Sequence, residues 1–350
     1  MGAMAVHSET ARPSTGTPPW WRRGPVVAGV VVLILGVELI LGWHALVDAL
    51  AQLRAPRWNW VGLAVLAELA SMGTYARMQR ALLRGAGTKV SIRKHLVTAY
   101  AAHSLSATLP GGPVFSTSFS FQMMRRFGAS PAVASWCVAL SGVLSTGALV
   151  VIGAVGGLLS RHTDSWHSLI GYAVAALVIA LGVRLLAQHP EWLDAPVRAV
   201  LHGVNRVRRR PAAHGHDRLL GFVAQLREVR VHPANVAVAV ALALLNWLFD
   251  ALCLWLCCVA VGAHGISPVN LVIAYCAGMA AASVPIVPGG LGVVDAALVL
   301  GLVTGGLTSA AAIAAVVLYR LLSFGFIIGL GWLFWLAIRA KVRASSARTA

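Results

Sequence analysis

The sequence predicts an all-α polytopic membrane protein with six full-length transmembrane helices and two re-entrant broken-helix hairpins in an inverted repeat. Three observations support this fold class: the composition, the placement of the basic residues, and a self-similarity between two Pro-Gly-Gly segments. Of 350 residues, 58% are hydrophobic and only 11% are charged. Because a soluble domain has about 25% charged residues, the apolar surplus is expected to face lipid.

Six segments are long and apolar enough to cross a bilayer, which takes about 20 residues. They are residues 25–43, 58–78, 131–159, 166–187, 233–262 and 308–338. Two shorter apolar stretches, 95–109 and 269–287, each run into a Pro-Gly-Gly sequence. Proline removes a backbone donor and glycine tolerates non-helical geometry, so the helix is expected to be interrupted at both places.

The net charge of +17 does not indicate nucleic-acid binding, because the basic residues cluster between the apolar runs. Such clustering is typical of cytoplasmic loops. The basic clusters all lie on the cytoplasmic side if both termini are cytoplasmic and the six long helices cross the membrane fully. The hairpin at 95–124 is then entered from the cytoplasm and the hairpin at 269–304 from outside. Two eight-helix arrangements, in which these hairpins span the membrane, stay open as alternatives.

One membrane domain is expected over residues 25–338, with halves at about 58–159 and 233–338. The connecting loop, 188–232, holds two basic amphipathic patterns. These favour helices that lie in the membrane interface and attract anionic headgroups, the alternative being a solvated linker. The polar, Pro-containing residues 1–24 are expected to be a disordered cytoplasmic N-terminus, and residues 339–350 a basic cytoplasmic tail.

The most informative feature is the internal repeat. Residues 99–110 (AYAAHSLSATLP) match residues 274–285 (AYCAGMAAASVP) at five positions with a constant offset of 175. Each stretch then reaches a Gly-Gly pair, the second after three additional residues. Paired breaks in two halves indicate a repeat transporter, and the amides at the start of each following half-helix favour an anion. Two ordinary kinked helices are the alternative interpretation.

Arg320 lies deep within the last apolar run. An unpaired Arg at the bilayer centre costs at least about 2.5–3.5 kcal/mol, so a partner is expected. Asp295, in the first turns after the second break, is the leading candidate. A structural ion pair and a phosphate-binding role for Arg320 are both open, and the two can alternate. The residues predicted to bind substrate are Pro110, Gly111, Gly112, Ser116, Thr117, Pro288, Gly289, Gly290, Asp295 and Arg320.

Three further polar residues within apolar segments, Glu68, His103 and Asp250, are candidates to carry protons for coupling. For each residue alone, hydrogen bonding within the bundle is the favoured reading. The five cysteines lie in apolar runs and are expected to be packing residues. Neither a cofactor nor a metal is expected, because no cluster of ligands has the spacing of a metal site.

Three segments carry a family resemblance: LPGGPVFSTSF (109–119), VPGGLGVVDAALVLGLV (287–303) and YRLLSFGFIIGLG (319–331). They resemble the membrane region of lysylphosphatidylglycerol synthases and its YbhN-like relatives. The resemblance implies a flippase-like fold of two inverted repeats that moves aminoacylated or other phospholipids between leaflets. Asp295 stands where the family usually has Glu, and Arg320 matches its Arg. The first motif has Phe115, Ser116 and Thr117 where the family often has an acid. The resemblance therefore does not determine which lipid headgroup is bound.

The leading hypothesis is a lipid translocator of the inner (plasma) membrane that moves a phospholipid or another anionic-headgroup lipid. The alternatives are an ion-coupled transporter of a small solute and a non-catalytic partner of a lipid- or glycan-modifying enzyme. Enzyme activity is not expected, because no aminoacyltransferase domain follows the membrane region. The expected partners are membrane lipids, and the further candidates are a second copy of the chain and a lipid-modifying enzyme. A lateral opening between helices would favour a lipid, and a closed wet vestibule a solute.

Overall fold

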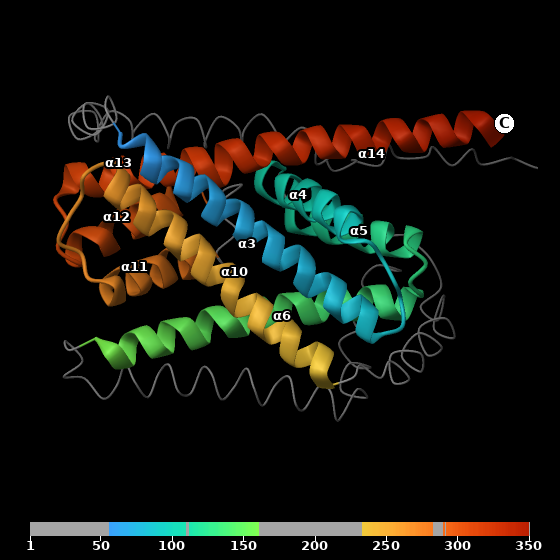
Figure 1. Cartoon of the computed structure of the whole chain (residues 1–350), viewed down its shortest axis with the longest axis horizontal. Helices are drawn as coiled ribbons and strands as arrows, with labels where there is room; N and C mark the ends of the chain where they lie inside the picture. The colour runs from blue at the N-terminus through green and yellow to red at the C-terminus, as the bar shows by residue number, and fades with distance from the viewer. Residues whose placement is uncertain (1–55, 110–111, 161–232, 283–289, 291, 350) are drawn as a thin grey trace, which may run out of the picture. The chain divides into compact units, whose positions relative to one another are not determined.

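The computed structural model describes residues 56–109, 112–160, 233–282, 290 and 292–349. The predicted segments 1–24, 25–43, 166–187 and 188–232 lie outside this part of the chain. The described part contains helices and no strand (Figure 1). The helices are α3 (Trp58–Gly85), α4 (Ile92–Thr108), α5 (Gly112–Arg126), α6 (Pro131–Leu159), α10 (Pro233–Ala260), α11 (Pro268–Ala281), α12 (Val293–Thr304), α13 (Ser309–Arg320), the π-helix η4 (Leu321–Phe326) and α14 (Ile327–Thr349).

Three of the described helical runs are long and apolar enough to cross a membrane: Pro131–Leu159, Ala234–Ala260 and Ser309–Ala340. They confirm the apolar helices predicted at 131–159, 233–262 and 308–338. The predicted segment 58–78 lies within α3, which is not one of the three and carries three Arg in its last turns. Residues 339–349, expected as a tail, continue helix α14.

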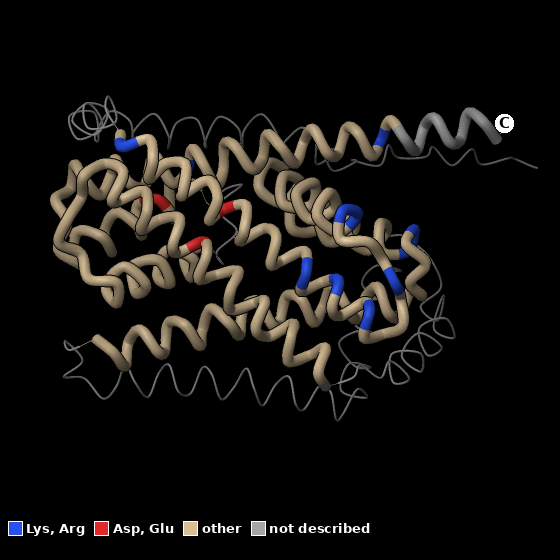
Figure 2. Tube along the Cα trace, viewed as in Figure 1, with Lys and Arg blue, Asp and Glu red and all other residues tan. Residues whose placement is uncertain are grey.

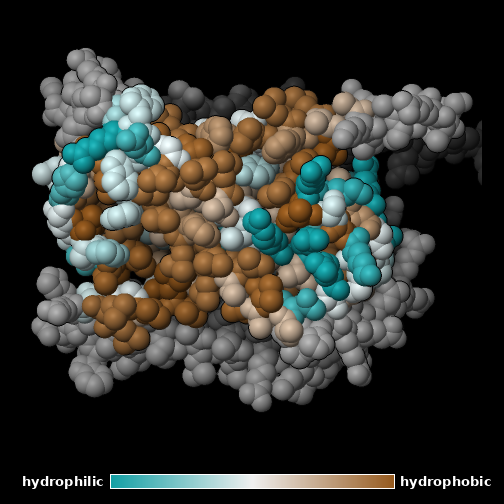
Figure 3. Space-filling model, in the orientation of Figure 1, coloured by the Kyte–Doolittle hydropathy of each residue, from teal (hydrophilic) through white to brown (hydrophobic). Residues whose placement is uncertain are grey.

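Charge and hydropathy are distributed unevenly over the described residues. Figure 2 shows Lys and Arg gathered mainly where α3 ends and α4 begins, whereas the Asp and Glu residues lie within the bundle. Figure 3 shows apolar side chains across the middle of one face and polar side chains at its two ends. Several large apolar side chains of the described helices are exposed, for example Leu66 at 61% and Val238 at 50%. A surface of this kind is suited to lipid contact.

Local sequence explains where several helices begin. Ser130 precedes Pro131, and its hydroxyl accepts a hydrogen bond from the Val133 amide at 3.2 Å. Ser267 precedes Pro268 and caps the Asn270 amide in the same way at 3.1 Å. Both positions combine an N-cap hydroxyl with a proline at the first helical residue, where its missing N–H costs nothing.

The helix bounds repeat along the chain. Helices α3 and α10 have 28 residues each, and they begin 175 residues apart and end 175 residues apart. After the breaks the offset is 178: α6 begins at Pro131 and α13 at Ser309, and α5 ends at Arg126 and α12 at Thr304. The additional three residues are the insertion before the second Gly-Gly pair. The correspondence seen in the sequence therefore extends to whole helices.

Helices α3 and α10 pack along each other in opposite directions. The Arg57 amide, before α3, donates to the Ala260 carbonyl at the end of α10 at 2.9 Å. Near the middle of both helices, the Ser71 hydroxyl donates to Asn246 Oδ1 at 3.2 Å, and these two residues are also 175 apart. A two-fold relation brings equivalent residues together only at its axis. The contact between Ser71 and Asn246 thus marks where such an axis would pass.

The Ser71–Asn246 contact can be tested by a double-mutant cycle with Ser71→Ala and Asn246→Ala. We expect a coupling free energy of about 0.6 kcal/mol, the usual size for a hydrogen bond between membrane helices. Unfolding in mixed micelles would measure it. A control cycle pairs Ser71→Ala with Thr304→Ala, because in the described structure the Thr304 hydroxyl bonds to carbonyls of its own helix. If the Ser71 and Asn246 effects were as additive as those of the control, the contact would not exist.

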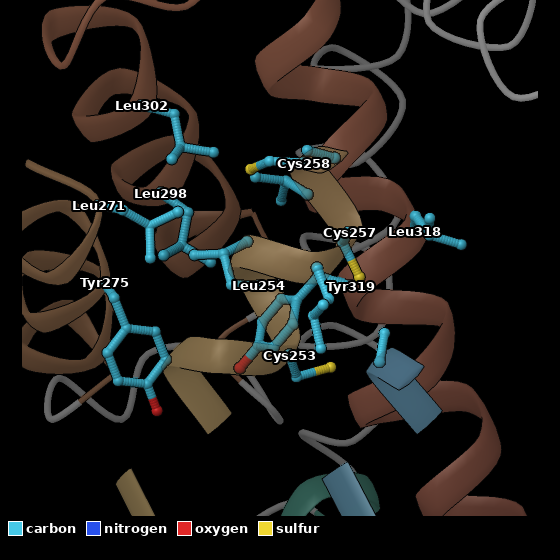
Figure 4. Close-up of a cluster of buried hydrophobic side chains, with 14 of the residues drawn as sticks. Cys253, Leu254, Cys257, Cys258, Leu271, Tyr275, Leu298, Leu302, Leu318 and Tyr319 are labelled. Atoms are coloured by element: carbon cyan, nitrogen blue, oxygen red, sulfur yellow. The ribbon is translucent and has the colours of Figure 1, made fainter. Parts of the chain in front are cut away.

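The largest buried cluster joins both halves of the described chain. Figure 4 shows its side chains converging from α10, α11, α12 and α13, among them Leu254, Leu271, Leu298 and Leu318. Cys253, Cys257 and Cys258 pack in the same cluster, and all five cysteines are free thiols. The prediction that the cysteines are packing residues is confirmed for these three.

Candidate functional site

Both predicted helix interruptions are present. Helix α4 ends at Thr108 and α5 begins at Gly112, and α11 ends at Ala281 and α12 begins at Val293. Pro110, Gly111, Pro288 and Gly289 lie outside the described residues. A Cβ on Gly112 would lie 1.9 Å from the Ser106 carbonyl oxygen, so the reversal between α4 and α5 requires glycine there.

The second break ends in left-handed backbone. Gly290 and Gly292 have φ values of 66° and 81°, which side-chain-bearing residues rarely adopt. Gly292 immediately precedes α12, and its amide donates to Asp295 Oδ2 at 2.9 Å. Asp295 therefore caps the helix on which it lies, where the positive end of the helix dipole favours an acid.

Asp295 and Arg320 form an ion pair, as expected from the sequence. Arg320 is the last residue of α13, and its Nε donates to Asp295 Oδ1. The two carboxylate oxygens of Asp295 are thus divided between its own helix start and the guanidinium of a neighbouring helix. The pair gives Arg320 the partner that its position in an apolar helix requires.

The ion pair does not use all of the Arg320 guanidinium. Its Nη2 is buried and has no hydrogen-bond partner among the described residues. The side chain is 18% exposed, and its Cζ lies 5.9 Å from the centroid of the Phe324 ring. The π-helix η4 begins at the next residue. Because π-helical segments often occur at functional sites, this placement adds to the case for Arg320.

A groove of about 400 Å³ opens beside the ion pair. It is lined by Asp295, Val299, Ile313, Val316, Val317, Arg320, Leu321, Phe324 and Gly325. Apart from Asp295 and Arg320, the lining is apolar, and Leu321 at its edge is 58% exposed. The groove therefore combines one charged end with an apolar wall, which suits an amphiphilic ligand rather than a polar one.

The candidate residues of the first half lie elsewhere. Ser116 and Thr117 are on α5, which packs against α4 and α6, whereas α12 packs against α11 and α13. The Ser116 hydroxyl donates to the carbonyl of Pro113 at 3.3 Å. Neither residue lines the groove, whose described lining comes from α12, α13 and η4. Convergence of both breaks on one headgroup stays a prediction.

A second polar cluster lies in the interior. Asp250 on α10 accepts hydrogen bonds from Tyr275 Oη at 2.7 Å and Tyr319 Oη at 2.8 Å. The Glu68 carboxyl on α3 lies beside that of Asp250, and His103 on α4 is within electrostatic range of Asp250. The structure therefore brings together the three residues predicted singly as candidates for coupling.

Sequence reasoning missed the two tyrosines of this cluster. Tyr275 was visible as the repeat partner of Tyr100, and Tyr319 as the neighbour of Arg320, but neither pattern indicates a carboxylate partner. Figure 4 shows the Tyr275 and Tyr319 side chains within the buried cluster, with Tyr319 beside Cys253. In the part of the chain described here, no group of three or more His, Cys, Asp or Glu side chains is placed to hold a metal.

Together these features define a helical membrane protein with interior acids and an ion pair at the end of an apolar groove. The chain belongs to the lysylphosphatidylglycerol synthase TM region family, whose model matches residues 26–331. Comparison with curated protein sequences gives no match.

Proposed function

We propose that this protein moves a lipid with an anionic headgroup between the leaflets of the inner membrane. The observation that carries the proposal is the groove beside Arg320, where an apolar wall meets a guanidinium with an unused donor. A lipid has the same division, with a charged phosphate at one end and acyl chains at the other. A small polar solute would gain little from a lining of Val, Ile, Leu and Phe.

The proposed architecture is an inverted repeat of six crossings and two re-entrant hairpins. The antiparallel packing of α3 and α10, with equal lengths and a constant offset, supports the inversion. The four hairpin helices have only 12 to 17 residues. At 1.5 Å per residue they span about 18–26 Å, less than the roughly 30 Å hydrocarbon core. The basic end of the bundle is the cytoplasmic side in this arrangement, with both chain termini there.

Arg320 exchanges its partner during transport in this proposal. The phosphate of an incoming lipid first meets the unpaired Nη2 and then displaces Asp295 from Nε. Asp295 keeps its hydrogen bond from the Gly292 amide, so its carboxylate is not left without a donor. The acyl chains stay along the exposed side of the groove, next to Leu321. Release of the lipid restores the ion pair.

The proposal is tested with the purified protein in vesicles that contain tail-labelled fluorescent phosphatidylglycerol, with dithionite quenching the outer leaflet. The protein should expose label from the inner leaflet faster than protein-free vesicles do. Ile313→Trp should slow this exchange at least about tenfold, a change of roughly 1.4 kcal/mol, because the indole would occupy the groove.

Leu300→Trp is the matched control. Leu300 lies on α12, is 65% exposed and does not line the groove. Its variant should exchange lipid at the wild-type rate. Equal rates for the wild-type protein and protein-free vesicles would refute the proposed function, and an unchanged rate in Ile313→Trp would remove the groove from it.

A further inference from the structure

Two carboxyl groups share one interior site where the two halves meet. Glu68, from α3, lies beside Asp250, from α10, and next to the Cys253 thiol. Glu68 is only 4% exposed, and its Oε2 has no hydrogen-bond partner among the described residues. Two adjacent carboxylates in an apolar interior repel each other strongly. Such a pair therefore titrates as a unit and holds a proton between its members.

The hydrogen bonds favour Asp250 as the ionised member of the pair. Asp250 accepts one tyrosine hydroxyl on each of its oxygens, which is the bonding pattern of a carboxylate. Glu68 receives no comparable pair of donors, and a buried ionised carboxylate without donors would be costly. This pattern favours Glu68 as the member that carries the proton and Asp250 as the member that carries the charge.

The charge on Asp250 is connected to the groove through a single helix. Tyr319 and Arg320 are consecutive residues of α13: the first donates to Asp250 and the second pairs with Asp295. Movement of the shared proton from Glu68 to Asp250 would weaken the bonds of Asp250 to both tyrosines. That change would loosen the end of α13 where Arg320 lies and where η4 begins. A change in the protonation of Asp250 would therefore affect the position of Arg320 through the end of α13.

Among the described residues, one group that faces the pair is suited to pass a proton to it. In the described part of the chain, the titratable side chains that interact with Glu68 or Asp250 are Cys253, Tyr275, Tyr319, Tyr100 and His103. Of these, His103 is the exposed one, whereas Cys253 and the three tyrosines are buried. An imidazole also exchanges protons near neutral pH more readily than a thiol or a phenol.

We propose that Glu68 and Asp250 bind one exchangeable proton, delivered through His103, and that its uptake and release accompany lipid movement in the groove. Only the transport part of this inference rests on the proposed function. The proton comes from water and returns to water on the other side, so no further reactant is needed. The site would make the protein a proton-coupled lipid transporter.

The proton site itself is tested without transport, by infrared spectroscopy of the purified protein at pH 7 in H₂O and D₂O. The wild-type protein should show a protonated carboxyl band that shifts on deuteration and disappears in Glu68→Gln. Asp295→Asn is the control and should keep the band, because Asp295 is paired with Arg320 as a carboxylate. A wild-type protein without the band, or a Glu68→Gln variant that keeps it, would overturn the proposal.

Coupling is tested in the same vesicles with and without a pH gradient of about one unit. A fully coupled proton would change the wild-type rate by up to about tenfold, since one unit corresponds to 1.36 kcal/mol. In Glu68→Gln and Asp250→Asn the ratio of the two rates should fall to one, whereas Cys258→Ala, in the same buried cluster but outside the pair, should keep the wild-type ratio. A gradient response that persists in both acid variants, or that is missing from an active wild-type protein, would overturn coupling. If the wild-type protein moves no lipid, the proposed function fails and the infrared result alone decides the proton site.

Discussion

Arg320→Ala should lower the rate of lipid movement by roughly ten- to 150-fold. A hydrogen bond to a charged group contributes about 1.5–3 kcal/mol, and Arg320 supplies the groove with its unpaired donor. Arg320→Lys should fall between the wild type and Arg320→Ala, because an ammonium keeps the charge but lacks the planar fork that binds a phosphate at two points. The vesicle exchange assay with labelled phosphatidylglycerol measures all three rates.

A structural role for the same ion pair gives a different pattern. Arg339→Ala is the control, since Arg339 is exposed on α14 and stacks over Trp335 at 4.7 Å from the ring centroid. It should leave the exchange rate unchanged. If Arg320→Ala lowered the unfolding temperature but exchanged lipid at the rate of Arg339→Ala, the ion pair would be a packing feature and phosphate binding would be excluded.

Gly331→Ala should destabilise the protein by about 1–3 kcal/mol, the usual cost of overpacking a tight contact. A Cβ at Gly331, on α14, would lie 1.9 Å from Ser104 Oγ and 2.3 Å from the Tyr100 carbonyl oxygen of α4. The Ser104 hydroxyl also donates to the Ile328 carbonyl at 3.0 Å, so the two helices meet almost backbone to backbone. Unfolding in mixed micelles measures the loss.

Two other glycines provide controls for this prediction. Gly329, on the same helix, has no atom within 4 Å of an added Cβ, so Gly329→Ala should be neutral or stabilising by up to about 1 kcal/mol. Gly153 stands 178 residues before Gly331, at the equivalent position of the first half. There the nearest atoms, Cβ and Sγ of Cys276, would lie 3.6 Å away, so Gly153→Ala should be tolerated. Equal stability of Gly331→Ala and Gly329→Ala would contradict the packing of α4 on α14.

The sequence by itself determined the features that depend on local chemistry. Apolar length predicted the helix at 131–159, and the structure has it as α6 with the same bounds. Proline and glycine predicted both interruptions, since backbone geometry depends on neighbouring residues. The cost of a charge in an apolar helix required a partner for Arg320, and the repeat offset of 175 appeared again in the bounds of α3 and α10.

Only the tertiary structure decided which distant residues meet. Glu68 and Asp250 come from α3 and α10, and no sequence pattern indicated that they share a site or that two tyrosines would hold one of them. No sequence pattern predicted the π-helix within the helix expected at 308–338. None predicted that Ser116 and Thr117 would lie away from the groove. The physical reason is that hydropathy and backbone preference act over a few residues, whereas the position of a side chain in a bundle depends on how whole helices pack. Here that packing follows from the antiparallel meeting of two halves far apart in the chain.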